Sequence, residues 1–211
     1  MMTRTDRINA VARRVPTWVV YTLYAIPAPV FFWMAATGRM GAEPINALMR
    51  EYGEIALQLL VIGLCVSPLR RLFGVNLIKF RRALGLLAFF YVTLHLLVWA
   101  VLDLQSLDRI WADILKRPYI TVGMSAFVLM LPLVLTSNNW SVRRFGQSWR
   151  KLHQLTYVIA ALGALHFVWL AKGFQLEPLV YLAIIVTLLV SRLVLRKGFS
   201  WRSKHPSQRA L

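Results

Sequence analysis

Six long apolar segments constrain this chain more than any other feature of its sequence. Each is about 17 to 25 residues long, the length that a helix needs to cross the hydrocarbon core of a bilayer. Because lipid offers no partner for exposed backbone amides, and the segments lack the alternation of barrel strands, each segment must be helical. The sequence therefore predicts an all-α integral membrane protein, a bundle of six transmembrane helices. The expected spans are 17–36, 54–72, 83–103, 119–136, 152–171 and 178–196, between a basic N-terminal segment (1–16) and a basic tail (197–211).

The distribution of charge separates a membrane protein from a nucleic-acid-binding one. Only 16% of the residues are charged and 58% are hydrophobic, although the net charge is +17. A typical soluble domain has roughly 25% charged residues. The basic residues stand in short clusters between the apolar segments, and no soluble part remains to form a basic groove. We therefore expect the lipid bilayer, and no nucleic acid, as a partner.

The same clusters predict the orientation of the chain. If both termini are cytoplasmic, most of the 25 Lys and Arg residues lie on the cytoplasmic side, and every Asp and Glu except Asp6 lies on the other side. That asymmetry follows the positive-inside rule for an even number of spans. We expect a multi-pass protein of the bacterial inner membrane. The single cysteine, Cys65, excludes an intramolecular disulfide and a covalently attached haem, which needs C-x-x-C-H.

Two histidines in different spans are expected at the same depth. His95 lies roughly 18 Å along the third span from its cytoplasmic end, and His166 lies roughly 21 Å along the fifth. If the two helices face each other, they present one imidazole each to the space between them, as axial ligation of haem iron requires. The pattern predicts that His95 and His166 bind the iron of a b-type haem in the outer half of the bilayer.

A third histidine, His153, predicts a further site near the cytoplasmic surface. On one continuous helix the thirteen residues from His153 to His166 turn the side chains about 220° apart, which counts against a simple stack of two haems. The third span offers no histidine at the level of His153, where Arg81 and Arg82 stand. Arg82 suits a haem propionate or a flavin phosphate. The number of haems, one or two, is left open, and His205 in the basic tail is expected to be solvated.

Several motifs, in order and spacing, resemble the MsrQ family of haem-binding membrane subunits. That family is similar in turn to the ferric reductase-like transmembrane domain of NADPH oxidases and iron reductases. The resemblance runs from the second to the sixth span. The motifs are Arg81-Arg82-Ala83-Leu84-Gly85-Leu86, His95, Arg117-Pro118-Tyr119, Gly123, Leu135-Thr136-Ser137, Gly146, Trp149-Arg150-Lys151-Leu152-His153, Tyr157 and His166.

The resemblance implies an electron-transfer subunit rather than a complete enzyme. Electrons would pass from the quinone pool or a cytoplasmic flavin reductase to a periplasmic molybdopterin-containing methionine sulfoxide reductase, for the repair of oxidised periplasmic proteins. It also implies FMN, for which no motif here indicates a site. In the wider family two helices each contribute two histidines, whereas the third span here has only His95. Any inner haem therefore lacks an evident second ligand.

Other functions fit parts of the pattern. A stand-alone ferric reductase or a quinol-oxidising cytochrome b anchor would use the same haem. A proton-coupled transporter would use the histidines as proton relays, and a cofactor-free scaffold would use them for helix contacts alone. No G-x-G-x-x-G fingerprint or soluble dehydrogenase domain occurs, so electrons would need a separate donor. The outer loops 38–53 and 103–118 are expected docking surfaces for a partner.

Overall fold

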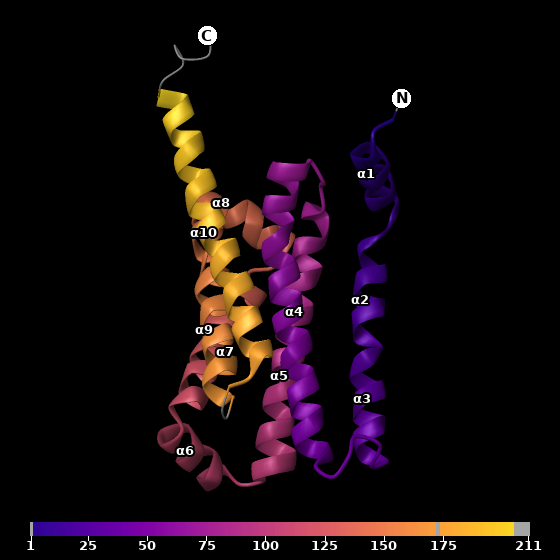
Figure 1. Ribbon diagram of the computed structural model, residues 1–211, viewed down its shortest axis with the longest axis vertical. Coiled ribbons are helices and arrows are strands. Elements are labelled where there is room, and N and C mark those ends of the chain that lie inside the picture. Colours follow the sequence, from indigo (N-terminus) through magenta and orange to yellow (C-terminus); the bar gives the residue numbers. More distant parts are fainter. Residues whose placement is uncertain (1, 172–173, 205–211) are drawn as a thin grey trace.

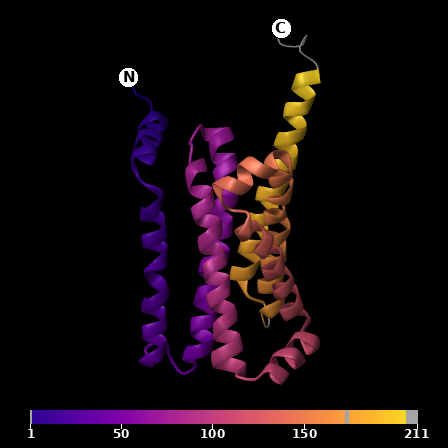
Figure 2. The same cartoon turned by 180° about the vertical axis from the view of Figure 1, so that it is seen from behind.

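Helices account for most of the chain in the computed structural model, which describes residues 2–171 and 174–204. No strand occurs within these ranges. Helix α1 and the C-terminal end of α10 lie at one end of the bundle, and α6 lies at the other (Figures 1 and 2). The helices are α1 (Arg4–Arg14), α2 (Thr17–Ala25), α3 (Pro27–Ala36), α4 (Pro44–Phe73), α5 (Arg81–Leu97), α6 (Leu107–Lys116), α7 (Pro118–Leu135), α8 (Asn139–Leu152), α9 (Leu155–Leu170) and α10 (Leu176–Lys204), with a 3-10 turn η1 (Ile78–Phe80) and a π-helical segment η2 (Val98–Leu104).

The helices have the lengths that a multi-pass membrane protein requires. Among the described residues, four stretches are long and apolar enough to cross a bilayer: Thr17–Ala36, Pro44–Phe73, Ile78–Leu104 and Pro118–Leu135. A fifth is formed if α8 and α9, which meet at a bend of 45°, count as one span. The sixth predicted span coincides with α10, which continues to Lys204. His205 and the rest of the predicted tail beyond Lys204 lie outside the described residues.

Two predicted outer loops are largely helical. Helix α4 begins at Pro44, ten residues before the predicted start of the second span. Hydropathy missed these residues because the first turns of α4 are polar. Pro44 occupies the first turn, where its missing N–H costs no hydrogen bond. The predicted loop 103–118 contains the amphipathic helix α6. Pro118 begins α7, one residue before the predicted start of the fourth span.

Four of the helices pack as two pairs that also contact each other. Helix α4 packs along α5, α7 packs along α9, and α10 packs on α9 and α4. The first span, α2 with α3, packs on α5 and α4 and is tied there by two tyrosines. The hydroxyl of Tyr52 donates to the carbonyl of Ala28 at 2.6 Å, and that of Tyr91 donates to the carbonyl of Tyr24 at 2.6 Å.

Large apolar side chains also cover the outside of the bundle. Val128, Val186 and Leu23 are 55%, 48% and 62% exposed within the single chain. A soluble monomer rarely exposes apolar surface on this scale, whereas a membrane protein presents it to lipid tails that are as apolar as leucine. The chain is a multi-pass membrane protein, and this surface faces lipid.

Candidate functional site

His95 lies on the buried face of α5. Leu84, Ala88 and Tyr91 are buried on that helix, and His95 continues their spacing of three and four residues, which keeps side chains on one face. Its ring points at the neighbouring helix α4, where Nδ1 lies 2.8 Å from the carbonyl oxygen of Met49. Because a carbonyl only accepts, Nδ1 carries the proton and Nε2 is left as the lone-pair nitrogen.

His166 has the same arrangement on the other helix pair. It continues the face of α9 that buries Ile159, and its Nδ1 lies 2.7 Å from the carbonyl oxygen of Tyr119 at the start of α7. Here too the backbone carbonyl fixes the proton on Nδ1 and leaves Nε2 unprotonated.

Each ring rests on a glycine four residues after the accepting carbonyl. Gly53 follows Met49 on α4, and Gly123 follows Tyr119 on α7. A Cβ atom at Gly53 would lie 3.1 Å from Nδ1 of His95, and one at Gly123 would lie 2.9 Å from Nδ1 of His166. Each imidazole therefore lies against backbone that only glycine leaves open.

The two rings meet across the space between the helix pairs. Their centroids are 6.2 Å apart and their planes are at 89°. Two metal–nitrogen bonds of about 2 Å, added to the distance from each nitrogen to its ring centre, separate two axial imidazole centroids by roughly 6 Å. The separation of His95 and His166 therefore fits two imidazoles on opposite sides of one metal ion.

Both histidines line a cavity of about 290 Å³ whose other walls are mostly apolar. We call it the outer cavity because Asp103 and Arg117, which line it, flank α6 at the end of the bundle predicted to face outward. Within the described ranges, no three His, Cys, Asp or Glu side chains gather around one point. A bare metal ion would need more protein ligands than these two imidazoles, whereas a macrocycle brings its own equatorial nitrogens. The donor set fits haem iron, with each second ring nitrogen held by a carbonyl as is usual for histidine ligands.

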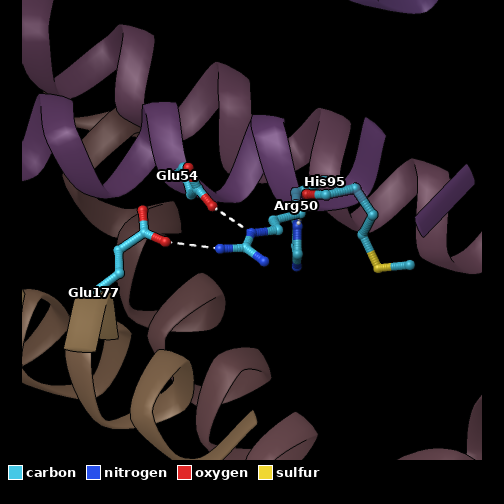
Figure 3. Close-up of polar contacts among 5 residues, drawn as sticks. Arg50, Glu54, His95 and Glu177 are labelled. Atoms are coloured by element: carbon cyan, nitrogen blue, oxygen red, sulfur yellow. Dashed lines mark hydrogen bonds and ion pairs between the residues drawn. The ribbon is translucent and has the colours of Figure 1, made fainter. Parts of the chain in front are cut away.

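Charged residues stand at the outer end of this cavity. The guanidinium of Arg50 donates from Nε to Glu54 at 2.6 Å and from Nη2 to Glu177 at 2.7 Å. Figure 3 shows this arginine beside His95, with Glu177 reaching it from α10. Arg117, just before α7, donates from Nε to Asp113 at 3.0 Å. Nη1 of Arg117 also donates to the Tyr119 hydroxyl oxygen at 3.2 Å, and this hydrogen bond raises the pKa of Arg117 above its ordinary value, so the guanidinium keeps its charge.

His153 lies between two helices rather than within the predicted fifth span. It is not on the helix that carries His166, because α8 ends at Leu152 and α9 begins at Leu155. The predicted 220° offset, which assumed one continuous helix, therefore does not apply. His153 stacks on Trp149, with ring centroids 3.9 Å apart, and its Nε2 lies 3.1 Å from the hydroxyl oxygen of Thr136.

His153 and Arg82 line a second cavity of about 740 Å³, together with Lys79, Arg81 and Arg150. We call it the inner cavity because these basic residues lie at the end of the bundle predicted to face the cytoplasm. None of the described residues that line it is acidic. Arg82 donates from Nη1 to the side-chain oxygen of Asn139 at 2.8 Å. The structure thus brings together two residues that the sequence analysis named, His153 and Arg82, and the basic lining that they share suits an anionic group.

Three parts of the site were missed from sequence. Gly53 and the Met49 carbonyl were placed in a loop, because α4 was expected to begin at residue 54. Thr136 and Gly123 belong to motifs noted above, but their contacts with the histidines come from helix packing. Arg50 had no sequence signal beyond its position among acids on the outer side.

Comparison with known proteins identifies relatives of this chain. Residues 52–164 match the family described as ferric reductase like transmembrane component. The chain is 47% identical to the protein-methionine-sulfoxide reductase heme-binding subunit MsrQ of Rhizobium meliloti, over 88% of this chain and 86% of that protein. It is 48% identical to MsrQ of Agrobacterium fabrum, over 84% and 83% of the two chains, and 44% identical to MsrQ of Brucella ovis, over 83% and 80%. No solved structure gives a significant match. The chain therefore belongs to the MsrQ family, within the ferric reductase like transmembrane components.

Proposed function

We propose that this protein is the haem b electron-transfer subunit of a protein-methionine-sulfoxide reductase, with His95 and His166 as the axial ligands of an outer haem. The observation that carries the proposal is the 6.2 Å separation of the two rings across a mostly apolar cavity. The relatives named above are described as heme-binding subunits, which supports the same assignment.

The chain's own residues prepare this site for a metal. When bound, haem supplies one-electron iron chemistry, and the protein supplies ligation, orientation and surroundings. The carbonyls of Met49 and Tyr119 hold each imidazole in the tautomer whose Nε2 can coordinate. The mostly apolar walls would restrict the access of water to the bound group.

The inner cavity is proposed to hold the second redox group, through His153 and Arg82. Its basic lining would bind an anionic substituent, either a propionate of a second haem or the phosphate of FMN. The hydroxyl of Thr136 donates to the Pro132 carbonyl at 2.6 Å, so it accepts from Nε2–H of His153. Before His153 could coordinate iron through Nε2, that hydrogen bond would have to break.

The proposed electron path crosses the membrane from the inner to the outer site. The donor is the quinone pool or a cytoplasmic flavin reductase, and the acceptor is a periplasmic molybdopterin-containing methionine sulfoxide reductase. The basic end of the bundle, with both termini, faces the cytoplasm of a bacterial inner membrane, as the positive-inside rule predicts. The outer cavity then lies nearer to the periplasmic acceptor.

A pyridine haemochrome measurement on quantified, purified protein tests the cofactor and counts haems per chain. We expect at least one haem b, with a low-spin spectrum that His95→Ala or His166→Ala abolishes or converts to high spin. His205→Ala, in the tail, serves as the control and should change nothing. An unchanged low-spin spectrum in both ligand variants would contradict the assignment. Faster electron delivery to soluble ferric chelates than to the molybdopterin subunit would favour a stand-alone ferric reductase.

A further inference from the structure

The lining of the outer cavity changes from apolar to charged along the bundle axis. Leu60, Met130 and Ile159 form its inner part. Leu60 follows Gly53 by seven residues on α4, which places it about 10 Å farther from the outer end than the glycine that His95 contacts. The carboxylate edge of a haem cannot face this apolar wall without losing its hydration uncompensated. That edge must therefore face the outer end.

Two arginines line the cavity at that end, one from each helix pair. Arg50 precedes Gly53 by three residues on α4, and Arg117 precedes Gly123 by six residues at the start of α7. Each cation thus stands on the outer side of the backbone unit that holds one of the two histidines. Haem carries two propionates on one edge, which matches two cations on one side of the rings.

In each guanidinium, one terminal nitrogen makes none of the contacts described above. The contacts of Arg50 use Nε and Nη2, and those of Arg117 use Nε and Nη1, the latter donating to the Tyr119 hydroxyl at 3.2 Å. Nη1 of Arg50 and Nη2 of Arg117 take no part in them. The two side chains are each 55% exposed, so they have room to turn toward a ligand.

Acidic neighbours set the strength of any such contact. Glu54 and Asp103 also line the cavity, and Glu54 is already bonded to Arg50. An incoming carboxylate would share each guanidinium with a protein carboxylate. Removal of Glu54 should therefore strengthen the contact, whereas removal of Arg50 should weaken it.

We propose that the outer haem lies with its propionate edge toward the outer end of the bundle, where Arg50 holds one propionate and Arg117 holds the other. This inference rests on the proposed outer haem. It gives the Arg117-Pro118-Tyr119 motif three functions in one turn: a cation for the cofactor, the start of α7, and the carbonyl that orients His166. It also directs the carboxylate edge of the macrocycle toward the side on which the electron acceptor is expected.

Haem dimethyl ester, which lacks the propionate charges, separates this contact from axial ligation. The full-length protein, purified without haem, is reconstituted with haem b or with the ester, and the rate of haem transfer to excess apomyoglobin is measured. We expect the wild type to release the ester roughly 10-fold faster than haem b for each charge-assisted hydrogen bond that is lost.

Arg50→Ala and Arg117→Ala should each reduce the difference in release rate between haem b and ester, and Arg50→Lys and Arg117→Lys should restore part of it. Arg39→Ala is the matched control, because Arg39 lies over the ring of Trp33 and does not line the cavity.

Two further variants distinguish propionate binding from a purely structural function of Arg50. Glu177→Gln removes the ion pair that ties α4 to α10 but leaves the cation, so it should keep the preference for haem b over ester. Glu54→Gln should increase that preference. Equal release of haem b and ester by the wild type, with a resonance Raman propionate band that Arg50→Ala does not move, would overturn the inference even if His95 and His166 proved to be ligands. If the wild type binds no haem through those histidines, the proposed function itself fails.

Discussion

Gly123 leaves the space that the ring of His166 occupies, since a Cβ atom there would lie 2.9 Å from Nδ1 of His166. This distance is shorter than an ordinary carbon–nitrogen contact, and α7 and α9 pack against each other along their length. Gly123→Ala must therefore displace the imidazole and break its hydrogen bond to the Tyr119 carbonyl. We expect most of the low-spin haem signal to be lost or converted to high spin, as measured by absorption and electron paramagnetic resonance of the purified protein.

Substitutions at two other glycines serve as comparisons for the effect of Gly123→Ala on the haem spectrum. Gly53→Ala, with a contact of 3.1 Å to Nδ1 of His95, should perturb the haem less than Gly123→Ala does. Gly85→Ala on α5 meets nothing within 4 Å and should leave the spectrum as in the wild type. A normal spectrum in Gly123→Ala would mean that the ring can move without loss of coordination, contrary to this prediction.

Sequence periodicity was sufficient to predict the level of His95 and His166, because helical rise converts residue number into depth. It could not predict which backbone atoms orient the rings. The Met49 carbonyl and Gly53 belong to polar first turns of α4, and hydropathy does not distinguish a polar helical turn outside the lipid from a loop. The break between α8 and α9 was missed for the opposite reason, since the apolar pattern begins at Leu152 and gives no sign that His153 ends the preceding helix.

Replacement of His153 should impair electron entry without changing the outer haem. His153 lines the inner cavity, whereas His95 and His166 line the outer one. In His153→Ala we expect reduction by a quinol or flavin donor to slow several-fold while the low-spin signal of the outer haem is retained. Stopped-flow reduction monitored at the haem band measures this. Wild-type reduction kinetics would argue against an inner redox site at His153.

Loss of the tyrosine hydroxyls that tie down the first span should lower stability but not alter the cofactor. Tyr52 and Tyr91 donate to main-chain carbonyls of α3 and α2, and their rings pack edge to face at 5.8 Å. Tyr52→Phe and Tyr91→Phe each remove one side-chain hydrogen bond to a main-chain carbonyl, at a cost of about 0.5 to 1.5 kcal/mol. Thermal unfolding in detergent should show a lower midpoint for both, with an unchanged haem spectrum. Wild-type unfolding midpoints would show that these hydrogen bonds do not stabilise the bundle.

The assignment of an inner and an outer cavity depends on the orientation of the bundle, which labelling of introduced cysteines can test. Cys65 is the single cysteine of the chain, so Cys65→Ala gives a background without thiols. Ser148 is exposed on α8, at the end that holds both termini, and Asp108 is exposed on α6 at the opposite end (Figure 1). Because the basic clusters flank the first of these ends, an impermeant maleimide added to spheroplasts should label Asp108→Cys at once and Ser148→Cys only after lysis. The reverse pattern would place the His95–His166 site on the cytoplasmic side, where haem held between those rings could not pass electrons directly to a periplasmic acceptor.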